Sequence, residues 1–197
     1  MRKKIIKSKE RVKEFAEVYT PENIVSDMLN LIPKSDFGIH TTFLEPACGN
    51  GNFIEKILER KFKLCKSKHD VLYSLGTVYG IDIQPDNVEE CKERIEEMML
   101  KFGGNSDNVV TETYNTNKDL VHTILDLNIV EGDFLTLDKK DIVLVDWEFY
   151  KTRKKGDKNH SCKQISLFGL CKKKENEIPA IKKTGKKKAY ELTPGFL

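Results

Sequence analysis

The sequence predicts an α/β fold, with a doubly wound and mostly parallel sheet, from two observations. Short apolar strands alternate with longer amphipathic segments along residues 42–145, which is typical of a parallel sheet covered by helices. The first strand also runs directly into a glycine turn, FLEPACGNGNF at residues 43–53, as strands do where such sheets bind ligands. The length of 197 residues allows one ordinary domain and a tail.

The first predicted elements surround this turn. Thr20 is a good N-cap, Pro21 stands where helices accept proline, and apolar residues then recur at helical spacing, so a helix is expected at residues 21–32. A short strand at residues 42–45 follows. Beyond the glycine turn, apolar residues again repeat at helical spacing and predict a helix at residues 52–62.

The alternation of strand and helix continues to residue 145. The expected elements are a strand at 77–82, a helix at 87–102, a polar loop at 103–117, a helical segment at 118–127, and strands at 128–130 and 141–145. The residues after Phe149 do not read as three further strands, so the sheet is predicted to be incomplete after its fourth strand.

The charge distribution divides the chain into an acidic body, residues 1–150, and a basic tail, residues 151–197. The tail carries 14 Lys and Arg against 4 Asp and Glu, a net charge of +10; the total of +3 therefore leaves 3 − 10 = −7 on the body. Lysine tracts with little apolar sequence between them predict a flexible tail. Two interpretations stay open, a solvated tail that aids solubility and a segment that binds the phosphates of nucleic acid.

Composition favours a cytoplasmic protein. The five cysteines are odd in number and form no CxxC pair, as in a reducing compartment, and their irregular spacing with His160 predicts no metal site. No apolar run approaches the roughly 20 residues that span a bilayer, so no membrane contact is expected. The basic N-terminus lacks the apolar stretch of a signal peptide.

Acidic residues end three successive predicted strands, and they indicate what the sheet binds. Glu45 precedes the glycine turn, where it would repel a pyrophosphate and attract an ammonium group, and the turn matches the dinucleotide pattern GxGxxG only in part. Asp82 is placed to bind ribose hydroxyls. Asp133, with Phe134 beside it, suits the amino edge and ring of adenine. An adenosine that carries an amino acid, as in S-adenosylmethionine, has all of these groups.

The same residues resemble a known family. The segments YTP (19–21), EPACGNGNF (45–53), YGIDIQPDNVEEC (79–91) and EGDF (131–134) are similar to motifs X, I, II and III of the DNA methyltransferases that methylate amino groups, especially adenine N6. The motif order X-I-II-III is that of members whose cofactor region precedes the target-recognition region. The resemblance covers roughly residues 11–149 and implies a Rossmann-like methyltransferase fold.

The resemblance also implies roles for individual residues. Tyr19, Thr20 and Pro21 would flank the methionine end of the cofactor, and Glu45 would hold its ammonium group. Ala47, Cys48 and Gly49 would shape the turn. The nucleoside would be bound by Asp82, Ile83, Asp133 and Phe134.

The catalytic motif IV of the family departs from its usual form. The family has (Asn/Asp/Ser)-Pro-Pro-(Tyr/Phe/Trp), whereas this chain has Asp146-Trp147-Glu148-Phe149. By resemblance, Asp146 would accept a hydrogen bond from the target amine and Phe149 would stack on a flipped base. Both prolines are absent, and with them the φ angle that they fix.

The tail contains one apolar island, QISLF, at Gln164–Phe168. It resembles the short peptide by which bacterial DNA-associated proteins dock on the replication sliding clamp; the alternative is that it packs back on the body. Two functions therefore stay open. One is a DNA adenine-N6 methyltransferase, or its cofactor-binding subunit, in a restriction-modification setting with a second methyltransferase or specificity subunit. The other is a non-catalytic protein with a methyltransferase fold that binds S-adenosylmethionine and DNA and is recruited to the sliding clamp through its tail.

Overall fold

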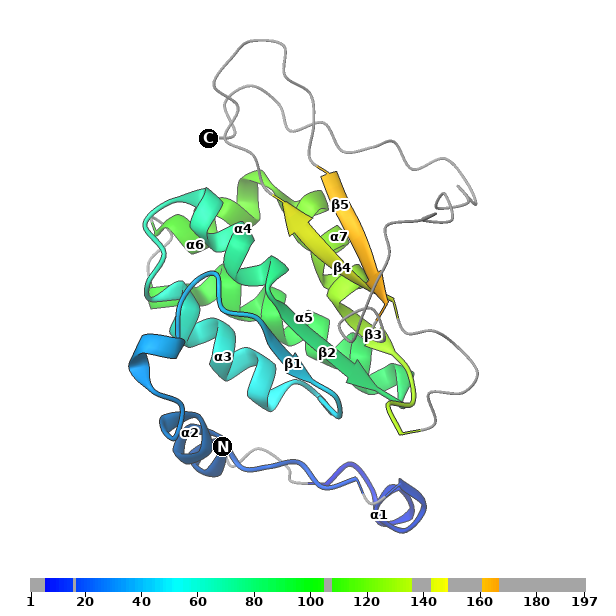
Figure 1. Ribbon diagram of the computed structural model, residues 1–197. Helices are drawn as coiled ribbons and strands as arrows, with labels where there is room; N and C mark the ends of the chain where they lie inside the picture. The colour runs from blue at the N-terminus through cyan, green and yellow to red at the C-terminus, as the bar shows by residue number, and fades with distance from the viewer. Residues whose placement is uncertain (1–5, 16, 105–107, 136–142, 149–160, 167–197) are drawn as a thin grey trace.

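The computed structural model describes residues 6–15, 17–104, 108–135, 143–148 and 161–166. Its elements lie in the order shown in Figure 1: α1 (Lys9–Phe15), α2 (Glu22–Asn30), η1 (Lys34–Asp36), β1 (Phe43–Glu45), α3 (Asn52–Phe62), α4 (Lys68–Gly76), β2 (Val78–Asp82), α5 (Pro85–Lys101), η2 (Phe102–Gly104), α6 (Val109–Thr116), α7 (Lys118–Asn128), β3 (Ile129–Glu131), β4 (Val143–Glu148) and β5 (Ser161–Ser166). No helix in these ranges is both long and apolar enough to cross a membrane.

A three-stranded parallel sheet is the centre of the fold, as the alternation of strands and helices predicts. The strand order is β1-β2-β3, and both pairings are parallel, with Phe43 opposite Val78 and Gly80 opposite Ile129. All five residues of β2 are buried, because the strand is covered on both faces. This explains why β2 has no alternation of apolar and polar residues before Asp82.

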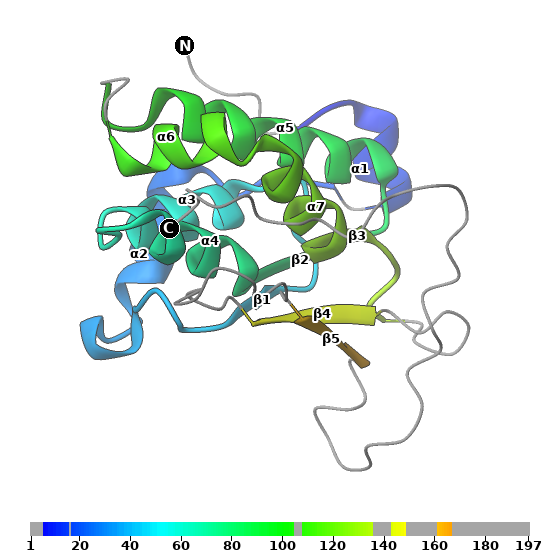
Figure 2. The ribbon, with the colours of Figure 1, turned by 90° about the horizontal axis from the view of Figure 1, so that it is seen from above.

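The two faces of the sheet have different covers. Helices α3, α5 and α7 pack on one face, where the main apolar core surrounds the buried Ile54, Ile95 and Ile124. On the other face, Tyr79 and Ile81 of β2 pack against Leu144 of β4. Figure 2, a view turned by 90°, shows the helices and the β4–β5 ribbon on opposite sides of the sheet.

The fourth strand differs from its sequence-based prediction. β4 begins at Val143 and extends to Glu148, and it pairs antiparallel with β5 in a separate two-stranded sheet, instead of joining the parallel sheet. The Tyr79 hydroxyl donates a hydrogen bond of 2.6 Å to the Val145 carbonyl, which holds β4 across the face of β2. Six residues of the segment predicted as a flexible tail form β5, including the first three of the QISLF island.

Two helices that the sequence did not predict fill the gaps between predicted elements. α4 begins at a capping box, in which Ser67 and Asp70 bond each other's backbone N–H groups. α6 lies within the expected polar loop 103–117, and the side chain of Asn108 caps it by accepting from two backbone N–H groups. A third helix without a sequence-based prediction, α1, lies at the start of the region of resemblance and precedes the YTP segment.

Buried polar side chains hold the amino end of the parallel sheet. Lys61 is fully buried, and its Nζ donates to the Thr41 carbonyl at 2.5 Å and to Thr77 Oγ1 at 2.7 Å. Burial lowers the pKa of Lys61 to about 7. Asn128 donates to the carbonyls of Leu75 and Val78, and it accepts from the indole of Trp147 at 2.8 Å. This end is therefore closed by structural contacts, and the opposite, carboxyl end is the one open to a ligand.

Candidate functional site

A cavity of about 640 Å³ lies at the carboxyl ends of the three parallel strands. Four chain segments line it: the N-terminal segment around residues 13–20, the glycine turn with the start of α3 at 45–53, the end of β2 with the start of α5 at 82–87, and the loop after β3 at 132–135. Its volume falls in the roughly 300–1,000 Å³ range of small-molecule sites.

The structure brings together ten of the eleven residues that the sequence assigned to the cofactor. The ten that line the cavity are Tyr19, Thr20, Glu45, Ala47, Cys48, Gly49, Asp82, Ile83, Asp133 and Phe134. Pro21 does not line it; this residue is exposed and precedes α2 as its N-cap, with φ −60° and ψ 147°. Residues more than 100 positions apart in the chain thus surround a single space.

The geometry of the glycine turn requires glycine at both of its glycine positions. Gly49 and Gly51 have φ angles of +53° and +89°, in the region that favours glycine. A Cβ on Gly51 would lie 2.5 Å from the sulfur of Cys91 on α5, and one on Gly49 would lie 3.2 Å from the ring of Tyr19. The turn is therefore in close contact with α5 and the N-terminal segment, besides bordering the cavity.

Cys48 forms an uncharged part of the cavity wall. Its backbone N–H donates to the Ile81 carbonyl at 2.8 Å, which fastens the turn to β2. A hydrogen bond with the Cys91 thiol, and burial, raise the pKa of Cys48 well above its usual range. The side chain is thus a neutral thiol rather than a nucleophile or a metal ligand. Within the described ranges, no group of three His, Cys, Asp or Glu side chains is arranged to bind a metal ion.

Asp82 connects the second strand to the turn. Its Oδ2 accepts from the Gly49 N–H at 2.8 Å, and its Oδ1 accepts from the Gln84 N–H at 2.9 Å and from the Asn87 amide at 3.1 Å. A carboxylate has roughly four lone-pair sites. Three are occupied by these donors, so one acceptor position stays available to a hydroxyl in the cavity.

The other predicted acids stand at the ends of the neighbouring strands. Glu45, which ends β1, is half-buried and accepts from the Ala47 N–H at 3.4 Å; burial raises its pKa. Asp133 follows β3 and accepts from the Leu135 N–H at 2.9 Å. Phe134 packs against the cluster of Tyr79, Ile81 and Leu144, so its ring is held on the sheet side of the cavity.

The charges around the cavity favour a cationic ligand. Among the described residues that line it, the acidic ones are Glu14, Glu17, Glu45, Asp82 and Asp133, and the basic one is Lys13. A concave site with an excess of carboxylates attracts positive charge and repels a phosphate. The arrangement therefore argues against a dinucleotide and suits a ligand that carries ammonium or sulfonium groups.

Sequence reasoning missed two residues that organise the cavity. Glu17 is nearly buried and forms a two-point contact with Arg11. Asn87, in the first turn of α5, is 1% exposed and contacts both the end of β2 and the N-terminal segment. A signal for Asn87 was present, since an asparagine occupies a position where the buried face of an amphipathic helix normally has an apolar residue.

Of the two predicted catalytic residues, the structure describes Asp146, and it does not bring this residue to the cavity. Asp146 is exposed on β4 and does not line the cavity. The next residue, Trp147, bonds Asn128 at the amino end of the sheet, and the cavity lies at the carboxyl end. Phe149 lies outside the described residues.

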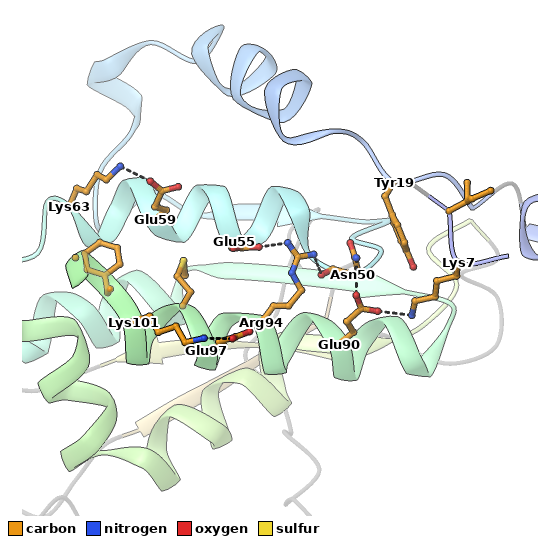
Figure 3. Close-up of a pocket in the computed structure, with 14 residues that line it drawn as sticks. Lys7, Tyr19, Asn50, Glu55, Glu59, Lys63, Glu90, Arg94, Glu97 and Lys101 are labelled. Carbon is orange, nitrogen blue, oxygen red and sulfur yellow. Dashed lines mark hydrogen bonds and ion pairs between the residues drawn. The ribbon is translucent and has the colours of Figure 1, made fainter. Parts of the chain in front are cut away.

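A second and larger cavity, of about 1070 Å³, lies between α3 and α5 (Figure 3). Its charged side chains pair with one another, as in Arg94 with Glu55 and Lys7 with Glu90. Tyr19 and Asn50 line both cavities and separate them. The charges of this second cavity are internally paired. Among the described residues that line it, one belongs to the predicted cofactor set, Tyr19, and none is a strand-end acid, so it is a weaker candidate despite its size.

Part of the chain is similar to a known methyltransferase. It is 33% identical over 80 residues to the Type II methyltransferase M.VspI of Vibrio sp. (strain 343), and this segment is 41% of the present chain and 16% of that protein. The chain thus matches a small part of that relative's length. No protein-family model matches the chain, and no solved structure matches it. The similarity supports a methyltransferase family, and the parallel sheet with its flanking helices is consistent with an incomplete Rossmann-like methyltransferase fold.

Proposed function

We propose, from this similarity and the cavity, that the chain binds S-adenosylmethionine and provides the cofactor-binding part of a DNA methyltransferase that acts on adenine N6. The observation that carries the proposal is the convergence of ten predicted residues, from four separate segments, around one cavity. This convergence supports the proposal because the resemblance implies that these four segments surround one ligand.

The residues of the cavity fit the cofactor group by group. Glu45 is a carboxylate for the ammonium of the methionine end, and the remaining acceptor position on Asp82 suits a ribose hydroxyl. Asp133 and Phe134 stand after the third strand, where an adenine amino group and ring face would lie. When bound, S-adenosylmethionine supplies the methyl group from its sulfonium, and the acidic lining favours that positive charge.

The assignment to DNA adenine rests on the motifs rather than on the cavity. The segments that resemble motifs X, I, II and III stand in the order of amino-methylating DNA methyltransferases, and the relative is a Type II methyltransferase, which suits a restriction-modification setting. The basic segment 151–197 would bind the DNA backbone, and Gln164–Phe168 would dock on a sliding clamp. Recognition of the target sequence would be supplied by a second methyltransferase or specificity subunit.

A second function is favoured by the position of Asp146. Because this residue is exposed on β4 and does not line the cavity, the chain could bind S-adenosylmethionine and DNA without transferring the methyl group. Asp146 and Phe149 remain the proposed catalytic pair for the first function.

Transfer of a labelled methyl group tests the two functions against each other. The protein is incubated with tritiated S-adenosylmethionine and unmethylated DNA, with Asp146→Ala as the control. Label in N6-methyladenine that depends on Asp146 supports the methyltransferase. Cofactor binding without transfer, in the presence of any co-purifying subunit, excludes it and leaves the binding protein.

A further inference from the structure

Asn87 stands where the second strand, helix α5 and the N-terminal segment meet. Its side-chain Nδ2 donates to Asp82 Oδ1 at 3.1 Å and to Glu17 Oε2 at 3.1 Å. Its Oδ1 accepts from the Tyr19 hydroxyl at 2.8 Å. Asn87 is 1% exposed, so these three bonds satisfy its amide in a place that water does not reach.

An amide is needed at this position because its partners differ in kind. Asp82 and Glu17 are carboxylates that only accept hydrogen bonds, whereas the Tyr19 hydroxyl donates one. The asparagine side chain offers two donor hydrogens and an acceptor within a few ångströms. It also separates two carboxylates that would repel each other if they were brought together without a donor between them.

Two residues that bond Asn87, Asp82 and Tyr19, also line the cofactor cavity. On one side, Asp82 accepts from the N–H of Gly49 and so fixes the glycine turn. On the other side, Tyr19 packs against Gly49 and lines the cavity together with Thr20. Without Asn87, each half keeps some of its own contacts, such as the Tyr19 hydroxyl bond to Glu17 at 3.0 Å, and Tyr19 still packs against Gly49. The two halves lose the hydrogen bonds that join them through the amide.

We propose that Asn87 is a positioning residue that joins the wall at the methionine end of the cofactor, Tyr19 and Thr20, to the ribose-binding carboxylate of Asp82. This inference rests on the proposed binding of S-adenosylmethionine. In this role Asn87 fixes the positions of two wall residues relative to each other. Its amide bonds Tyr19, which lies at the methionine end of the ligand, and Asp82, which lies at the ribose.

Replacement with aspartate gives the sharpest test, because the side chain keeps its size and loses its donor. The ionisable groups around position 87 are Asp82, Glu17, Tyr19, Arg11, Asp86, Glu90 and Lys7, of which Arg11 and Lys7 pair with carboxylates. A new carboxyl between Asp82 and Glu17 has its pKa raised by both neighbours. In its protonated form it has an O–H group that can again donate a bond.

The experiment measures the Kd for S-adenosylmethionine by calorimetric titration of the full chain over a pH series. Asn87→Asp loses both bonds that Nδ2 donates, and it is expected to bind about 10- to 100-fold more weakly than wild type at neutral pH. As the pH falls, its Kd is expected to approach the wild-type Kd measured at the same pH. Glu17→Gln in the same variant is expected to recover part of the affinity lost at neutral pH, because it supplies a donor to the new carboxylate, while Asp82 still lacks its donor. Asn128→Asp is the matched control, since Asn128 is equally buried and lies at the other end of the sheet.

Each result has one meaning. A Kd of Asn87→Asp that equals the wild-type value at every pH overturns the role of Asn87 and leaves cofactor binding intact. A wild-type protein that binds no S-adenosylmethionine overturns the proposed function and this inference with it. If Asn87→Asp does not fold, Asn87→Ala replaces it, with the same loss expected at neutral pH, and an unchanged Kd overturns the inference.

Discussion

Replacement of Gly51 by alanine should destabilise the protein strongly, because two separate effects oppose a Cβ at this position. Gly51 has a φ of +89°, and the added Cβ would lie 2.5 Å from Cys91 Sγ and 3.1 Å from Cys91 Cβ. The clash is with a residue on the buried face of α5, where the sulfur has no room to move aside. Gly51→Ala therefore combines backbone strain with overpacking.

The size of the effect follows from these two contributions. A left-handed conformation costs a residue with a Cβ about 1–2 kcal/mol. Overpacking a dense core adds about 1–3 kcal/mol. The expected loss is thus about 2–5 kcal/mol, which is a large part of the roughly 5–15 kcal/mol that stabilises a domain.

Alanine substitutions at two other glycines separate the contribution of backbone strain from that of overpacking. Gly104 has a φ of +70° and open space around its absent Cβ, so Gly104→Ala should show the backbone strain alone, about 1–2 kcal/mol. Gly38 has neither a positive φ nor a contact closer than 3.5 Å, and Gly38→Ala should change stability by less than about 1 kcal/mol. The order of stability loss should be Gly51, then Gly104, then Gly38.

Urea unfolding followed by circular dichroism measures these differences. The double variant Gly51→Ala, Cys91→Ala removes the sulfur that the new Cβ meets, and it should recover at least about 1 kcal/mol relative to the sum of the single variants. A Gly51→Ala protein as stable as wild type, or the absence of any recovery in the double variant, would refute the reasoning about the turn.

Three further predictions concern the ligand, the fourth strand and the tail. Burial raises the pKa of Glu45, and the protonated acid cannot pair with an ammonium group. Affinity for S-adenosylmethionine should therefore be constant at high pH and fall by up to about tenfold per pH unit below that raised pKa. Glu45→Gln should bind more weakly and lack this dependence, and identical titration profiles of the two proteins would contradict the role of Glu45. Trp147→Phe leaves the buried Asn128 Oδ1 without its donor and should lower the free energy of unfolding by about 1–3 kcal/mol, whereas unchanged urea unfolding would be inconsistent with β4 at the amino end of the sheet. Deletion of residues 167–197 removes 8 Lys and 3 Glu. It should weaken DNA binding, measured by fluorescence anisotropy, and reduce the slope of the binding constant against salt concentration. An unchanged slope would leave only the solvated-tail interpretation.

The sequence was most informative where strands end. The three parallel strands and the helices α3 and α5 lie close to their expected bounds, because apolar periodicity and the glycine turn determine them locally. The residues assigned to the cofactor also converge, since parallel strands carry Glu45, Asp82 and Asp133 to the same edge of a sheet.

Contacts between distant segments could not be predicted in this way. The course of β4 depends on the Tyr79 hydroxyl and on pairing with β5, both of which involve residues far away in the sequence. The role of Asn87 likewise depends on Glu17 and Tyr19, which lie about 70 positions earlier in the chain. Helices α4 and α6 were missed for a different reason, because their side-chain caps, Ser67 and Asn108, are local signals that are also common in turns.

The most direct measurement is calorimetric titration of the purified chain with S-adenosylmethionine, alongside Asp82→Ala. If the cavity at the strand ends is the cofactor site, wild type binds with a single saturable site, and Asp82→Ala, which loses both the ribose acceptor and the bond to Gly49, binds at least about tenfold more weakly. A folded wild-type protein that takes up no S-adenosylmethionine, or an Asp82→Ala variant with undiminished affinity, would contradict this assignment.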